Sequence, residues 1–261
     1  MTDSGLLRWP VDVIFRPRGL VSTRAAERVP GVRSAIIASI RLSTFYFANL
    51  VLYALPLTLA GIGITETGPA PATFTTIVAP LLRAPDAAWQ VTMALAQNSA
   101  FLFVATALTF GTFHLGVFLT GSSAGVVRSL RTVSYSTGIY LAIIFTVVWV
   151  MATTPAIRVA DDFLIYLQAE FIYAVIDLTG AELGLPGGRP APVDLSQLTA
   201  IGQGLLVLLL LAAVYYLYVL YLGARVAHQA TRFEAAVAVG CVILAPVLYV
   251  LGLIVVTVIL G

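Results

Sequence analysis

The two histidines are the residues whose chemistry is easiest to name. His114 and His228 are the only histidines among the 261 residues, and imidazole is a common ligand for metals and haem. Neither has a carboxylate or a cysteine at ligand spacing, so we expect both to be satisfied by hydrogen bonds near a membrane interface. A haem or redox site that uses both rings is the alternative. The sequence predicts no cofactor and no metal site.

Signatures of catalysis are missing from the chain. It contains no G-x-S-x-G elbow, no H-E-x-x-H pair and no phosphate loop. The stretch GSSAG at 121–125 lacks the lysine of a phosphate loop, and we interpret it as a tight turn between two apolar runs. The single cysteine, Cys241, cannot form an internal disulfide. The sequence therefore predicts that the protein is not an enzyme.

Arginines supply the remaining candidate chemistry. All fourteen basic residues are arginine, and several of them stand with His228 in two short breaks between apolar runs. Adjacent helices would gather these side chains into one cationic face, which could hold anionic lipid head groups or dock an acidic protein partner. A role limited to fixing membrane topology is the alternative. The candidate binding residues are Arg128, Arg131, Arg225, His228 and Arg232.

Composition indicates what must position these residues. The chain is 60% hydrophobic and 10% charged, with a mean hydropathy of +0.99, whereas soluble domains carry about a quarter charged residues. Apolar runs near the ~20 residues that cross a bilayer predict an all-α, polytopic membrane bundle with five transmembrane helices. The predicted spans are 36–64, 94–120, 135–153, 202–223 and 235–261, and they follow a basic segment at 1–35.

Two segments are expected to lie at the membrane surface. Residues 1–35 mix six arginines with bulky apolar residues, a composition that suits the headgroup region. Residues 163–180 are nearly long enough to span, but Glu170 and Asp177 share one helical stripe with Asp162. Because an acid at the bilayer centre costs several kcal/mol, we predict a surface helix there.

The arginine distribution predicts an N-in, C-out topology in a prokaryotic cytoplasmic membrane. With five spans, the outside loops hold three arginines, Arg83, Arg158 and Arg189, and eight of the twelve acidic residues. The inside segments hold ten arginines, which is the asymmetry that the positive-inside rule expects. A sixth span at 163–180 would move Arg225 and Arg232 to the outside.

Polar and small residues within the spans suggest how the helices pack. We expect amides such as Asn98 and Gln203 to bond between helices, and Ala236 and Gly240 to form a small-residue contact. A small carrier or pore remains an alternative function, and it would need a water-filled path lined by Asn98, Thr106 or Gln203. The spans contain no central acid, which is the usual mark of an ion-coupled carrier.

Three segments resemble the Yip domain family, whose multi-span membrane proteins are named for their interaction with Ypt/Rab GTPases. VIFRPRGL at 13–20 is similar to the opening of its prokaryotic branch. GVFLTGSSAGVVRSLRTVSYST at 116–137 resembles its central hairpin, and YLGARVAHQATRFEAAVAV at 221–239 resembles its last loop. The resemblance implies five spans and a non-enzymatic role in organising or recruiting membrane components.

The chain also departs from the family pattern. It lacks the Asp-Leu-Tyr-Gly-Pro motif of the eukaryotic branch, so GTPase binding is not carried over. The expected partners are the lipid bilayer, including anionic lipids, and a membrane or cytoplasmic protein, with no nucleic acid.

Overall fold

The computed structural model describes residues 32–61, 69–154, 156–179, 188–194, 196 and 198–248, and every regular element within them is helical. This confirms the all-α prediction for the described chain. The basic segment before residue 32 and the end of the predicted fifth span lie outside these residues. The named helices are α3 (Val32–Leu59), α4 (Ala72–Val78), α5 (Pro85–Leu119), α6 (Val126–Ala152), α7 (Ala156–Thr179), α8 (Ala200–Ala227) and α9 (Arg232–Ile243).

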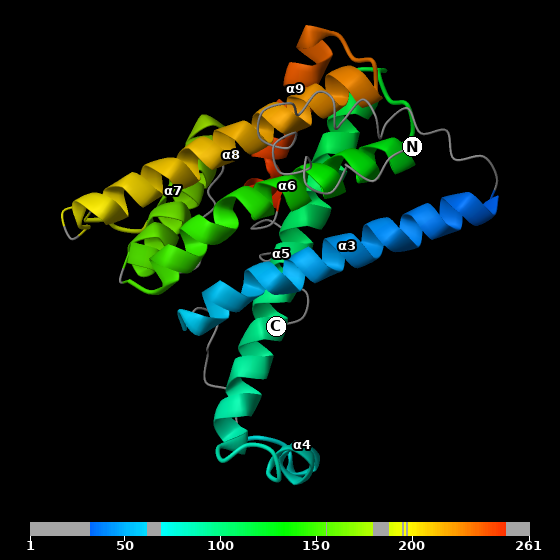
Figure 1. Cartoon of the computed structure of the whole chain (residues 1–261). Helices are drawn as coiled ribbons and strands as arrows, with labels where there is room; N and C mark the ends of the chain where they lie inside the picture. The colour runs from blue at the N-terminus through cyan, green and yellow to red at the C-terminus, as the bar shows by residue number, and fades with distance from the viewer. Residues whose placement is uncertain are drawn as a thin grey trace.

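The long helices are arranged in two directions. In Figure 1, α3, α6 and α8 run side by side, with α6 in contact with both neighbours and with α7. Helix α5 crosses this group, touching α3 and α6, and packs along α9, which also contacts α8. The N-terminal end of α5 extends clear of the group and lies beside α4 (Figure 1).

Two to three of the described helices could cross a membrane. Helices α5 and α8, with 35 and 28 residues, are long and apolar enough, since about 20 helical residues cover the hydrocarbon core. Helix α6 is a third if its two parts, Val126–Leu141 and Ile143–Ala152, bent by 43°, form one span. Helix α3 offers a shorter apolar stretch, Tyr46–Leu59, and α7, the predicted surface helix, is not among the candidates.

Several helices begin earlier than the apolar runs suggest. Helix α5 starts nine residues before the predicted span because Pro85 stands in its first turn, followed by Asp86, and both are favoured there. Helix α9 starts at Arg232 because Thr231 and Glu234 form a capping box. Helix α6 likewise includes Arg128, so the basic residues expected in loops lie on helix ends.

Prolines interrupt the stretch between α3 and α5. Helix α3 contains Pro56 and ends at Leu59, and Gly61 then takes a φ of +82°. The short helix α4 is fixed to α5, where the rings of Phe74 and Trp89 meet edge to face at 5.1 Å. Helix α3 thus ends within one turn after Pro56.

Polar contacts within the bundle are of mixed kinds. The Asn98 amide donates to the hydroxyl of Thr58 at 3.0 Å, joining α5 to α3, which confirms an interhelical role for this amide. Gln203 instead donates locally, to the carbonyl oxygen of Leu198 at 3.4 Å.

Small residues bring α5 against α9 at a position other than the predicted one. A Cβ on Gly116 would lie 2.6 Å from the Cα of Ala238, so the two backbones are nearly in contact. The predicted pair, Ala236 and Gly240, is exposed, and a Cβ on Gly240 would meet nothing within 4 Å. That prediction is wrong because α9 presents a neighbouring strip, containing Ala235 and Ala238, to the core.

Candidate functional site

The two histidines meet through one serine at the end of the bundle where α5 ends and α6 begins. The Ser129 hydroxyl lies 2.9 Å from Nδ1 of His114 and 3.2 Å from Nε2 of His228. The backbone N–H of Ala124, in the turn between α5 and α6, donates to Nδ1 of His228 at 3.0 Å. We call His114, Ser129 and His228 the histidine junction. It ties α5, α6 and the α8–α9 connection together, although its members are up to 114 residues apart in the chain.

The backbone contact fixes the tautomer of His228. A peptide N–H can only donate, so Nδ1 of His228 must offer its lone pair and the ring proton must be on Nε2. Nε2 then donates to Ser129, whose own hydroxyl proton is available for Nδ1 of His114. The three contacts form a directional chain of hydrogen bonds that requires a neutral His228.

The surroundings of the junction favour that neutral state. His228 is only 4% exposed and Ser129 is fully buried, and the ring of Phe113 meets His228 edge to face at 5.9 Å. Burial, with smaller contributions from His114 and Arg128, lowers the pKa of His228 to about 4. The prediction that this histidine is satisfied by hydrogen bonds is confirmed. Its assignment as a contact for lipid or partner is a correction, because its ring is buried and both nitrogens are bonded internally.

Two arginines brace the same end of the molecule. Arg128 donates from Nη1 to the carbonyl oxygen of Ala227 at 3.1 Å, and Arg225 donates from Nη1 to that of Ala230 at 2.9 Å. These oxygens lie at and just beyond the C-terminus of α8, where carbonyls lack helical partners and a cation is favoured. Both guanidiniums therefore have a structural role, although each has further N–H donors.

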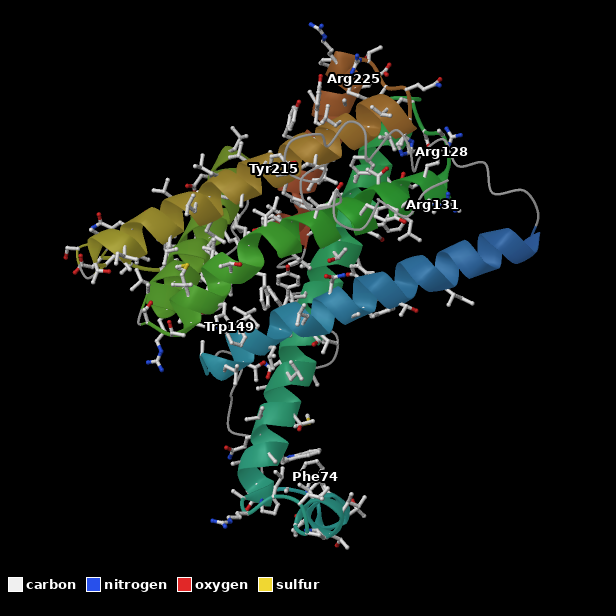
Figure 2. All side chains as sticks on the ribbon, in the orientation of Figure 1. Phe74, Arg128, Arg131, Trp149, Tyr215 and Arg225 are labelled. Carbon is white, nitrogen blue, oxygen red and sulfur yellow. The ribbon has the colours of Figure 1, made fainter. Side chains whose placement is uncertain are left out.

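The structure brings the predicted arginines to one end of the molecule. Figure 2 shows Arg128 and Arg131 near the start of α6 and Arg225 near the end of α8, while Trp149 and Phe74 lie far from them. Arg128 and Arg232, the first residue of α9, are exposed, and Arg131 and Arg225 are half-buried. Among the residues that the structure describes, the one ion pair joins Arg189 to Glu170, so no described carboxylate forms an ion pair with any of these four. We call Arg128, Arg131, Arg225 and Arg232 the arginine end.

Sequence reasoning missed the residue that connects the histidines. Ser129 lies between Arg128 and Leu130 at the start of α6, and only its placement against two other helices gives it a role. In the described part of the chain, no group of three or more His, Cys, Asp or Glu side chains could hold a metal ion. A haem held by both histidines would have to displace the bonds to Ser129 and Ala124.

Away from this end, an exposed pair fixes the segment after α7. Arg189 donates from Nε to Oε1 of Glu170 at 2.7 Å and makes a second bond to the other carboxylate oxygen. Its guanidinium carbon also lies 5.3 Å from the centre of the Tyr173 ring.

The arrangement at the arginine end can present positive charge on a rigid frame, and the histidine junction supplies the frame. Comparison of the chain with protein-family models, with characterised proteins and with solved structures gives no match.

Proposed function

We propose that the protein is a non-enzymatic, five-span protein of a prokaryotic cytoplasmic membrane, with an N-in, C-out topology and a likeness to the Yip family. Its arginine end organises or recruits membrane components by binding anionic lipid head groups or an acidic protein surface. The proposal keeps Arg128, Arg131, Arg225 and Arg232 as contacts. It assigns His228 to the hydrogen-bonded junction beside the helix ends that carry them.

One observation carries this proposal. Four guanidiniums from the ends of α6, α8 and α9 gather at one end of the bundle, and no described carboxylate pairs with them. Arginine presents several N–H donors that match phosphate and carboxylate oxygens, so such a group suits anionic head groups. A pattern that served topology alone would not need a buried hydrogen-bonded junction beneath it.

Charge-neutral variants test the proposal. The double variant Arg131→Gln, Arg232→Gln removes two positive charges. Neither side chain makes a hydrogen bond to the described chain, so the fold should be retained. We expect this double variant to retain several-fold less phosphatidylglycerol than the wild type after purification in mild detergent, measured by lipid mass spectrometry. The matched control, Arg83→Gln with Arg158→Gln, removes the same charge elsewhere and should retain the wild-type amount.

The variant with all four arginines changed to glutamine should show the largest loss. The same variants in pull-downs from membranes report on protein partners. If the four-arginine variant recovers the same lipids and proteins as the wild type, the proposal is wrong.

A reporter placed after Gly261 tests the topology separately. The five-span scheme expects that reporter outside the cytoplasm, and a reporter active in the cytosol would contradict it.

A further inference from the structure

A cavity of about 280 Å³ lies between α3, α5 and α6. Its wall is largely aromatic and aliphatic, with Tyr46 and Phe47 from α3, Phe103 and Phe110 from α5, and Leu130 and Ser134 from α6. Phe47 and Phe103 stack at 5.9 Å and are 51% and 46% exposed, so the cavity has an apolar flank open to the surroundings. In a bilayer that flank meets lipid, because α5 is a candidate span.

One polar group in the wall lacks a partner. Tyr46 is 8% exposed, and its hydroxyl makes no hydrogen bond to the described chain. The Thr106 hydroxyl is nearby and could accept while it donates to the carbonyl oxygen of Leu102 at 2.9 Å, but its contact with the Tyr46 hydroxyl does not have the geometry of a hydrogen bond. Buried hydroxyls nearly always form a hydrogen bond. A tyrosine hydroxyl without a partner beside a cavity therefore favours a ligand group that accepts a hydrogen bond from it.

The position of the cavity defines the shape of its ligand. Phe110 lies one helical turn before His114 in α5. Phe103 lies eleven residues before His114, which is about 16 Å from it along the helix axis. On α6, Arg131 directly follows the lining residue Leu130 in the chain and lies within one turn of Ser134, although it does not itself line the cavity. The cavity thus extends from the arginine end toward the apolar part of α5, and it suits a molecule that is apolar along its length and anionic at one end.

We propose that this cavity holds an acyl chain of an anionic phospholipid, whose phosphate is bound by Arg131 and whose ester carbonyl accepts a hydrogen bond from Tyr46. The inference rests on the proposed function, since it identifies the ligand of the arginine end as a lipid rather than an acidic protein. The stacked rings of Phe47 and Phe103 flank the acyl chain. The hydrogen bond from the Tyr46 hydroxyl sets how deeply the lipid enters the cavity.

The test uses the full chain in detergent micelles, with phosphatidylglycerol labelled on its acyl chain as the probe. Ala107 lines the cavity, so Ala107→Phe fills it. We expect at least fivefold weaker binding of the probe. Ala105→Phe adds the same bulk at an exposed position of α5 that does not line the cavity, and it should leave binding unchanged.

A second variant does not depend on added bulk. Tyr46→Phe removes only the hydroxyl, and we expect about threefold weaker binding with an unchanged or higher melting temperature, because an orphan buried hydroxyl is lost. Arg131→Gln should abolish the preference for phosphatidylglycerol over phosphatidylcholine. Free glycerol 3-phosphate should compete weakly, because it lacks the acyl chain.

The outcomes separate this inference from the proposed function. If Ala107→Phe and Tyr46→Phe both bind the probe normally while the arginine variants lose it, the cavity has no role and the proposed function stands. If Ala107→Phe does not fold, Tyr46→Phe alone decides. Competition by glycerol 3-phosphate as strong as by the whole lipid would also overturn the acyl-chain site. If neither the cavity nor the arginine variants alter probe binding, this inference fails, and the proposed function fails with it if the pull-downs are also unchanged.

Discussion

The histidine junction and the Arg189–Glu170 pair perform the same mechanical task in opposite ways. Each fixes a connecting segment to the helices, the turn after α5 in one case and the segment after α7 in the other. The junction is buried and joins residues up to 114 positions apart, whereas the pair joins residues 19 positions apart and its side chains are 53% and 29% exposed. The junction uses neutral groups and the pair uses full charges.

The difference follows from the cost of burying charge. An unpaired ion in an apolar interior is strongly disfavoured, so a buried polar contact is more stable when its groups are neutral. Burial accordingly lowers the pKa of His228 to about 4, which keeps the ring uncharged. Hydrogen bonding to Arg189 lowers the pKa of the Glu170 carboxyl, which keeps that group charged. A lowered pKa thus keeps the His228 ring neutral and the Glu170 carboxyl negatively charged.

The largest expected effect is the dependence of stability on pH at His228. The unfolded chain binds a proton near pH 6.5 and the folded chain only near pH 4, so the unfolded state binds more protons between these values. Stability therefore falls on acidification through this window, by roughly 3 kcal/mol in total. Unfolding in detergent at pH 7, 6 and 5 measures it.

His228→Asn is the matched control for that window. The asparagine oxygen can accept the Ala124 N–H without titrating, so the variant should lose most of the pH dependence between 6.5 and 4.5. The Glu170 contribution does not interfere, because it is lost only as pH falls below the ordinary glutamate value of 4.5. An unchanged pH profile in His228→Asn would show that the junction does not control stability.

The next effect concerns the close packing beside the junction. Gly116→Ala places a methyl group 2.6 Å from the Cα of Ala238, and because backbone cannot yield as a side chain can, the helices must separate. We expect a loss of about 1–3 kcal/mol, the usual cost of overpacking. Thermal unfolding in detergent gives the measurement.

Gly111→Ala in the same helix is the control for this packing. Its new methyl group meets nothing within 4 Å, and alanine is favoured over glycine in a helix by up to about 1 kcal/mol. We therefore expect equal or greater stability for this variant. Equal losses in the two variants would mean that α5 and α9 do not approach closely.

The runs of apolar residues in the sequence predicted the positions of most of the long helices. Apolar runs located helices over all five predicted spans, with α9 covering only the start of the fifth among described residues. Hydropathy alone misplaces the helix starts because it ignores local capping signals. The signals in this sequence are Pro85 with Asp86 for α5 and Thr231 with Glu234 for α9.

The candidate site could be predicted only in part, for a physical reason. The charge pattern predicted that the four arginines share one face, and the structure places them at one end of the molecule. Their bonds to the carbonyls of Ala227 and Ala230, and the contact of Ser129 with both histidines, depend on how helices meet. Contacts between residues about 100 positions apart leave no periodic signal in one sequence. For the same reason, the sequence predicted the wrong face of α9 to contact α5, with Ala236 and Gly240 in place of Ala235 and Ala238.

The smallest expected effect is at the Arg189–Glu170 pair, and it sharpens the contrast with the junction. Glu170→Gln removes one charge from an exposed contact, where solvent and salt already screen the attraction, so the melting temperature should change little. The segment that it fixes should loosen locally, because the neutral amide binds the Arg189 guanidinium more weakly than the carboxylate does. Hydrogen exchange should rise at residues 188–194 in Glu170→Gln, remain unchanged in the turn at 120–125, and rise equally in the wild type at high salt. Slower exchange than wild type at 188–194, or a melting temperature lowered as far as in Gly116→Ala, would show that this exposed pair stabilises the whole fold.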